Sequence, residues 1–151
     1  WHHGDYIEIT KNDGFIIRGR SDATLNPGGV RIGTAEIYQQ VEDIDFVTEG
    51  LVVGQNFNDD VRIILFVTTK NNQEINDEQI QLIKSRIRKN CSPKHVPTII
   101  IKVPAIPRTK SGKIVEIAVR KLINGEVLNN KEAIANPESL DFFKNLPQLK
   151  I

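Results

Sequence analysis

Hydrophobic and polar residues follow short-range patterns along the chain that predict strands in five places. Alternation, or continuous runs of Val, Ile and Leu, mark residues 6–10, 15–18, 50–55, 61–69 and 98–103. The first two stretches are separated by four residues that end in Asp13-Gly14, so they are expected to form a β-hairpin. The third and fourth stretches are expected to be buried strands joined through residues 56–60.

Apolar residues spaced three or four positions apart predict helices between and after the strands. Thr34 is expected to cap a first helix, and Asn76 a second one. Residues 114–123 predict a third helix. Asn136 is expected to cap a last short helix that has Pro137 at its first position.

This order of elements predicts an α+β fold, a small β-sheet of about three strands with helices packed on it. A β-hairpin within residues 1–21 precedes that core and is expected to be separate from it. The chain has 151 residues, of which 39% are hydrophobic and 26% charged, so it can bury a core. It contains no Met. The chain is therefore interpreted as a piece of a longer protein.

Several classes of protein are excluded by composition. No apolar run approaches the roughly 20 residues that cross a bilayer, so no membrane partner is expected. The single cysteine, Cys91, excludes a disulfide framework and fits a reducing compartment such as the cytoplasm. His2 and His3 are adjacent and too few for a metal centre, so no metal site is expected.

The charge of +1 is unevenly distributed. Residues 84–121 hold eleven basic residues and one acidic residue, Glu116, whereas the rest of the chain holds nine basic and eighteen acidic residues. This asymmetry indicates a local anionic partner, and a solvated cationic face is the simpler alternative. Aromatic residues do not interleave with the basic ones, which argues against a nucleic-acid partner.

A basic turn, residues 107–113, is the first group that could carry chemistry. Arg108, Lys110 and Lys113 lie within six residues that also contain a glycine. Because the turn is expected to open a helix, its free backbone N–H groups would suit phosphate or carboxylate. It is not a Walker loop, since Pro107 and Ile114 occupy positions where that motif needs Gly and Ser or Thr. A plain basic turn is the alternative.

Two further groups place glycine near arginine, residues 19–22 (Gly-Arg-Ser-Asp) and residues 28–31 (Gly-Gly-Val-Arg). Glycine permits close backbone approach to a ligand, and arginine can bind phosphate through two parallel hydrogen bonds. An ordinary loop with paired arginines is the alternative. Near the start, the carboxylate of Asp5 could accept hydrogen bonds from two adjacent sugar hydroxyls.

In order and spacing, these groups resemble the successive late motifs of the adenylate-forming acyl-CoA synthetases, the superfamily that includes luciferases and peptide-synthetase adenylation domains. The matching motifs are residues 4–5, 19–22, 29–37 and 107–113, and the resemblance spans about residues 1–123. Within the superfamily, the short-chain branch of acetyl- and acetoacetyl-CoA synthetases is most similar. The sequence after Lys113 looks most like the acetoacetyl-CoA subgroup.

The resemblance implies a role for each matching residue. Lys113 would be the catalytic lysine of adenylation. Asp5 and Arg20 would bind the nucleotide, at the ribose and near the ribose or α-phosphate, and Asp22 would be a hinge. The CoA-binding or thioester-forming face would contain Gly29, Arg31 and Arg88. Residues 1–21 would end the large adenylation domain, and residues 22–151 would form a mobile C-terminal lid with a C-terminal extension.

The function that the resemblance implies is ATP-dependent acid–CoA ligation. Acetoacetate, ATP and CoA would give acetoacetyl-CoA through an acyl-adenylate, with AMP and pyrophosphate released. ATP and CoA would be substrates, and Mg²⁺ is expected with ATP but bound outside this chain. The partner would be the N-terminal large domain of the same enzyme, without which this chain is expected to be inactive. Alternatives are the same chemistry on acetate or propionate, and a stand-alone basic module that binds nucleotides or nucleic acid.

Overall fold

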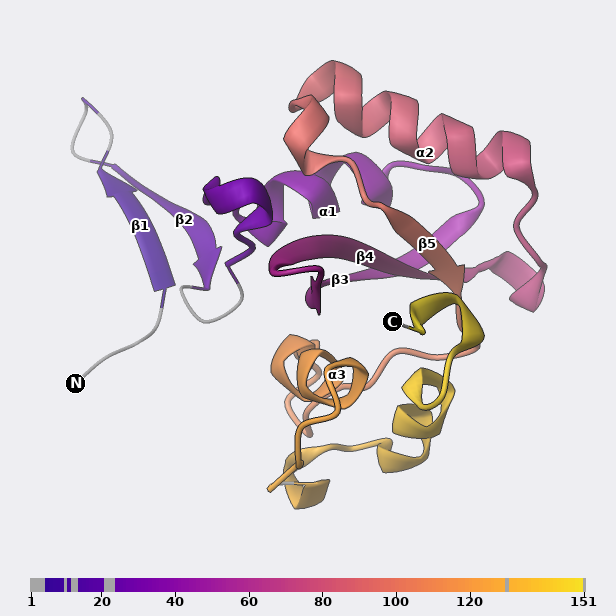
Figure 1. Ribbon diagram of the computed structural model, residues 1–151. Coiled ribbons are helices and arrows are strands. Elements are labelled where there is room, and N and C mark those ends of the chain that lie inside the picture. The colour runs from indigo at the N-terminus through magenta and orange to yellow at the C-terminus, as the bar shows by residue number, and fades with distance from the viewer. Residues whose placement is uncertain (1–4, 10, 12–13, 21–23, 130, 151) are drawn as a thin grey trace.

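The structure, a computed structural model, describes residues 5–9, 11, 14–20, 24–129 and 131–150 (Figure 1). Strands β1 (Asp5–Ile9) and β2 (Phe15–Arg20) pair antiparallel in a two-stranded sheet of their own. This confirms the predicted hairpin, whose two strands pair only with each other among the described residues. Part of its turn, residues 12–13, lies outside the described residues.

The main sheet contains β3 (Val47–Phe57), β4 (Asp60–Thr69) and β5 (Ile99–Lys102), in that order. β3 and β4 are antiparallel, and β5 runs parallel to β4. All three predicted strands are confirmed, but the connection between the first two is shorter than residues 56–60. Only Asn58 and Asp59 lie between the strands, and both have positive φ, +49° and +59°. Two left-handed residues make the tight turn that fits the twist of a hairpin.

Helices cover both faces of this sheet, as Figure 1 shows. α1 (Thr34–Glu42) and α2 (Asp77–Asn90) lie on one face, and α3 (Glu116–Ile123) lies on the other with the C-terminal residues. Side chains alternate along β3, so Val52 joins the first core while Leu51 and Val53 join the second. The arrangement confirms the α+β class.

Each core is built from aliphatic side chains of the sheet and of the helices that cover it. The first core includes Ile37, Val41, Val52, Leu65, Val67, Ile83 and Ile87. The second core includes Leu51, Val53, Ile64, Phe66, Ile101, Val119, Phe143 and Leu149. In the second core the ring of Phe143 meets Phe66 edge-on, with centroids 4.7 Å apart. The C-terminal segment is therefore part of the folded unit.

The beginnings of α1 and α2 differ from each other. Asn76 caps α2 as predicted, because its side chain accepts a hydrogen bond from the Gln79 N–H at 2.8 Å and the Gln79 side chain accepts one from the Asn76 N–H at 3.0 Å. The prediction that Thr34 caps α1 was wrong. Gly33 occupies that position without a side-chain cap, and Thr34 is the first helical residue, buried at 5% exposure. Packing against the core outweighs the capping preference there.

Two predictions for the C-terminal third were also wrong. Residues 114 and 115 are not helical, and α3 begins at Glu116. The last segment, Pro137–Phe143, is a 3₁₀ helix with Pro at its start as expected, but the Asn136 side chain does not cap it. In both places the chain forms hydrogen bonds with distant segments instead, as described below.

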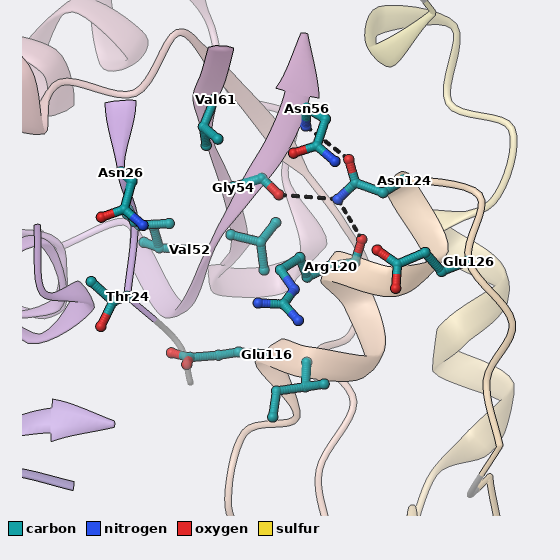
Figure 2. A pocket seen from close by; sticks show the side chains of 13 residues that line it. Thr24, Asn26, Val52, Gly54, Asn56, Val61, Glu116, Arg120, Asn124 and Glu126 are labelled. Atoms are coloured by element: carbon teal, nitrogen blue, oxygen red, sulfur yellow. Dashed lines mark hydrogen bonds between the residues drawn. The ribbon is translucent and has the colours of Figure 1, made fainter. Parts of the chain in front are cut away.

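β3 is an edge strand, and side chains bond three of its outward backbone groups. The Val52 N–H donates to the Tyr38 hydroxyl at 3.0 Å, and that hydroxyl donates to the Glu116 carboxylate. Asn124 accepts from the Asn56 N–H at 2.8 Å and donates to the Gly54 carbonyl at 3.2 Å (Figure 2). α1 and the residue that follows α3 thus supply hydrogen-bond partners for three backbone groups of the sheet edge.

No α-helix in the described part of the chain is long and apolar enough to span a membrane. Within the same residues, no group of three or more His, Cys, Asp or Glu side chains could hold a metal ion. Cys91 follows the last residue of α2, and burial raises the pKa of its thiol. A raised pKa disfavours the reactive thiolate.

Candidate functional site

The basic turn forms a compact hairpin, here called the Lys113 hairpin and defined as residues 107–115. Arg108 and Ile114 pair antiparallel, and the Thr109 N–H donates to the Lys113 carbonyl at 2.8 Å. The Gly112 N–H donates to the Thr109 carbonyl at 2.9 Å, and Gly112 has a φ of +82°. A left-handed residue of this kind favours glycine.

The prediction that this turn offers free N–H groups at a helix start was wrong. The Gly112 N–H is bonded within the hairpin, and so is the Lys113 N–H, which donates to the Thr109 hydroxyl at 3.1 Å. α3 begins only at Glu116. What the hairpin presents to a ligand is therefore a side-chain cation rather than a helix terminus.

The three cations of the hairpin are not equivalent. Lys110 and Lys113 are exposed, and none of the ion pairs found among the described residues involves either of them. Arg108 is only partly exposed and forms an ion pair with Glu49. It also donates to the Gly112 carbonyl at 2.7 Å. Arg108 thus stabilises the hairpin, whereas Lys113 extends from it.

The two positions expected to bind nucleotide lie opposite each other in the β1–β2 hairpin. Asp5 and Arg20 are backbone partners at its open end. The register shifts between Tyr6 and Ile7, which is where an irregularity enters the pairing. Asp22 lies outside the described residues, as do His2 and His3.

The glycine loop, residues 26–31, is closed by two reciprocal backbone hydrogen bonds. The Leu25 N–H donates to the Ile32 carbonyl at 2.9 Å, and the Ile32 N–H donates to the Leu25 carbonyl at 2.8 Å. Gly29 has a φ of +76°, and a Cβ atom there would meet nothing within 4 Å. Gly29 therefore borders open space, on a shallow hollow of about 550 Å³ shared with the β3–β4 turn.

The glycine loop is attached to β4 through a carboxylate. The Gly28 N–H donates to Asp60 at 2.8 Å, and the Val61 N–H donates to the same oxygen at 2.7 Å. These backbone donors lower the pKa of Asp60. Asp60 thereby remains a charged acceptor that fixes the loop position.

Cationic residues lie within the glycine loop, next to it and on α2. Arg31 and Arg88 are both exposed, and Arg88 lies near the basic C-terminal end of α2. Lys94 was not expected from the sequence, yet its ammonium lies 3.1 Å from the position that a Gly28 Cβ would take. Its place in the basic stretch and after the Pro93 turn was the available signal.

A histidine ties the segment after α2 to α1. His95 contacts the carboxylate of Glu36 through Nε2, and its Nδ1 lies 2.7 Å from the Ser92 hydroxyl. These contacts hold Lys94 and α1 in one unit around the glycine loop. His95 was not singled out from the sequence, because its partner Glu36 is distant along the chain.

The candidate residues fall on two sides of the main sheet. The Lys113 hairpin belongs with α3, whereas the glycine loop and Arg88 belong with α1 and α2 (Figure 1). Leu25 and Ile32, which flank the loop, are buried in the first core. The structure thus places the two groups of candidate residues back to back, with the sheet between them.

A partly open cavity of about 210 Å³ lies between β3, residues 24–26 and α3. Figure 2 shows the Glu116 and Arg120 side chains at its wall, with Asn124 bonded to the strand beside them. None of the residues that line it is a candidate site residue from the sequence.

Known proteins resemble this chain along nearly all of its length, although no protein-family model matches it. The acetoacetyl-coenzyme A synthetase of Rhizobium meliloti (strain 1021) is 58% identical over 150 residues, 99% of this chain and 23% of that protein. The acetoacetyl-CoA synthetase of Danio rerio is 45% identical over 152 residues, with the same coverage of 99% and 23%.

A solved structure agrees with these sequences. The acetoacetyl-CoA synthetase from Streptomyces lividans has a TM-score of 0.86 and 39% identity, covering 98% of this chain and 22% of that one. The chain spans about 23% of the length of the curated relatives it matches. In sequence and in fold, the chain corresponds to the C-terminal region of the acetoacetyl-CoA synthetases.

Proposed function

We propose that the chain is the C-terminal lid of an ATP-dependent acetoacetate–CoA ligase and that Lys113 acts in its adenylation step. Residues 1–21 would end the large domain, and residues 22–151 would form the lid. The observation that carries the proposal is the exposed Lys113 side chain beside the tight, internally bonded turn of its hairpin. An ordered turn can deliver one cation to a defined place in a partner domain.

Adenylation is the step that needs such a cation. A carboxylate oxygen of acetoacetate attacks the α-phosphorus of ATP, the bond to the β-phosphate oxygen breaks, and pyrophosphate leaves. Both reactants are anions, so a compact ammonium that approaches them stabilises the charge of the transition state. Asp5 and Arg20 would hold the nucleotide, and Asp22 would be the hinge. Mg²⁺ would accompany ATP, bound by parts of the enzyme outside this chain.

The second step would use the other side of the lid. The thiol of CoA, as thiolate, attacks the acyl carbonyl of the adenylate, and AMP leaves with its electron pair. Gly29 would let the pantetheine chain approach, and Arg31 and Arg88 would meet anionic groups of the bound substrates. The back-to-back faces support this division, because rotation about a hinge can exchange one face for the other.

The proposal is tested with Lys113→Ala in the full-length enzyme. Pyrophosphate exchange with acetoacetate and ATP should fall by about 100-fold or more. Thioester formation from preformed acyl-adenylate and CoA should change by less than about two-fold. Lys150→Ala, at an exposed lysine far along the chain, is the matched control and should leave both rates unchanged. Equal losses in both half-reactions would contradict the proposal.

The acid is tested separately. Acetoacetate should support pyrophosphate release by the wild-type enzyme more efficiently than acetate or propionate does, compared as kcat/KM. A preference for acetate or propionate would keep the chemistry and the role of Lys113 but replace the substrate.

A further inference from the structure

We infer that Asn136 is a positioning residue that holds the Lys113 hairpin in its adenylation geometry. The inference rests on the proposed function of Lys113 and adds the means by which that lysine is kept in place. Asn136 lies in the C-terminal extension, far along the chain from the hairpin. It was expected to cap a helix, and its side chain has a different role.

The Asn136 side chain bridges two backbone groups at the base of the hairpin. Its Oδ1 accepts a hydrogen bond from the Arg108 N–H at 2.8 Å. Its Nδ2 donates to the Ile106 carbonyl at 3.0 Å. An amide side chain is suited to this, because it offers an acceptor and a donor in one plane. The segment that enters the hairpin is thus fixed at the two peptide groups that flank Pro107.

The backbone next to Asn136 adds to this attachment. The Ala135 N–H donates to the Arg108 carbonyl at 2.8 Å, and Thr109 and Ile134 form an antiparallel bridge. Residues 134–136 therefore act as a third short strand beside the two arms of the hairpin. Two-stranded hairpins alone are marginal in water, whereas a third strand adds independent stability.

Asn136 is itself held by the second core. Its carbonyl accepts from the Ser139 N–H at 3.0 Å and from the Ser139 hydroxyl at 2.6 Å. Ser139, Leu140 and Phe143 follow it in the same 3₁₀ helix and are buried. The Asn136 amide is therefore anchored to the sheet through these buried side chains rather than to a free tail.

The contacts lead from Asn136 to Lys113 in two short steps. Arg108, held by Asn136, donates through its guanidinium to the Gly112 carbonyl at 2.7 Å. Thr109 comes next, and its N–H donates to the Lys113 carbonyl at 2.8 Å. Loss of the Asn136 bridge would thus loosen the backbone that carries the lysine. A misplacement of about 1 Å in a reacting group can cost about 100-fold in rate.

The test uses Asn136→Ala in the full-length enzyme, alone and combined with Lys113→Ala. The adenylation kcat should fall by about 10-fold, with the KM for ATP changed by less than about two-fold. Thioester formation from preformed acyl-adenylate should be unchanged. In the Lys113→Ala background the same substitution should have no further effect beyond about two-fold, because Asn136 acts through Lys113.

Two more variants make the test decisive. Asn136→Asp keeps an acceptor for the Arg108 N–H but places a carboxylate against the Ile106 carbonyl, so its adenylation kcat should lie between those of the wild type and Asn136→Ala. If the Asn136→Ala protein does not fold, Asn136→Asp serves as the test variant in its place. Glu138→Ala, at an exposed position two residues on, is the control and should keep wild-type rates in both half-reactions.

The possible results separate the two proposals. Wild-type adenylation by Asn136→Ala, equal loss in both half-reactions, or an undiminished loss in the Lys113→Ala background would each overturn the positioning role. If Lys113→Ala alone abolishes adenylation, the proposed function is supported in all three of these cases. Wild-type adenylation by Lys113→Ala would overturn the proposed function itself.

Discussion

Tyr38→Phe removes one oxygen atom from α1 and should destabilise the fold measurably. In the wild type the Tyr38 hydroxyl accepts from the Val52 N–H at 3.0 Å and donates to the Glu116 carboxylate. It is therefore the bridge between α1, the edge strand β3 and the start of α3. Phenylalanine keeps the ring and its packing but loses both hydrogen bonds.

The magnitude follows from the surroundings of the two lost partners. Val52 is 1% exposed, so its N–H would be left without a partner, at a cost of about 1–3 kcal/mol. A hydrogen bond to a carboxylate contributes about 1.5–3 kcal/mol, and the low end applies because Glu116 is partly exposed and can bind water. Together we expect a loss of about 2–4 kcal/mol, a large part of the roughly 5–15 kcal/mol that a domain has.

Urea unfolding of the chain, followed by circular dichroism, measures this loss. With a slope of about 1–3 kcal/mol per molar urea, the midpoint should fall by about 1–2 M while the slope stays constant. Gln39→Ala, at the exposed neighbouring position on α1, is the control and should change stability by less than about 0.5 kcal/mol.

The contribution of this bridge to the stability of the fold depends on pH. Burial, and then the nearby Glu116 carboxylate, raise the pKa of Tyr38 well above its ordinary value of 10.0. A raised pKa in the folded state means that this contribution is complete below about pH 10 and is lost as pH rises further. The stability difference between wild type and Tyr38→Phe should therefore be constant from about pH 7 to 9 and narrow above about pH 10. A Tyr38→Phe protein whose urea midpoint at neutral pH equals that of the wild type would refute the reasoning.

Two further substitutions test the packing of the C-terminal segment and the cap of α2. Phe143→Ala should lower the free energy of unfolding in urea by about 3–5 kcal/mol, because it removes a 1% exposed ring that packs on Phe66. Phe142→Ala, at the exposed neighbouring position, is the control and should change it little. Equal effects of the two substitutions would contradict the packing. Asn76→Ala should lower the free energy of unfolding by about 1 kcal/mol in the same assay, because it removes the capping box with Gln79. Asn76→Asp should retain most of the wild-type stability. An alanine variant as stable as the wild type would count against the cap.

Periodic patterns predicted the elements that depend on local sequence. The apolar runs at residues 50–55 and 61–69 form buried strands, because their successive apolar side chains enter the two cores in alternation. Asn76 could be recognised as a cap because its partner Gln79 is three residues away. Such information lies within one or two turns of chain, where pattern analysis is sensitive.

Polar contacts between distant segments could not be predicted in this way. Asn136 has the sequence context of a cap, yet its partners Ile106 and Arg108 lie about thirty residues earlier. Arg108 was grouped with the ligand-binding cations, but its partner Glu49 lies on β3. Asn124 follows the last residue of α3, and its side chain bonds the edge strand. An Asn or Arg side chain has many possible partners, and only the tertiary fold selects among them.

The candidate site shows the same division. Sequence order alone identified the Lys113 hairpin and the glycine loop, but not that they occupy opposite faces of the sheet. That separation follows from the faces on which the helices pack, because α1 and α2 cover one core and α3 covers the other. Lys94 and His95 became visible only through their contacts with residues around the glycine loop.

The side chains along β3 also affect how separate molecules meet. Strand edges with unpaired amides invite a second molecule to add its own strand, which is a common start of aggregation. Here the Val52 N–H, the Gly54 carbonyl and the Asn56 N–H are already bonded, and the opposite edge, β5, is only four residues long. The main sheet consequently offers fewer unpaired groups for intermolecular strand addition than an uncovered edge of the same length would.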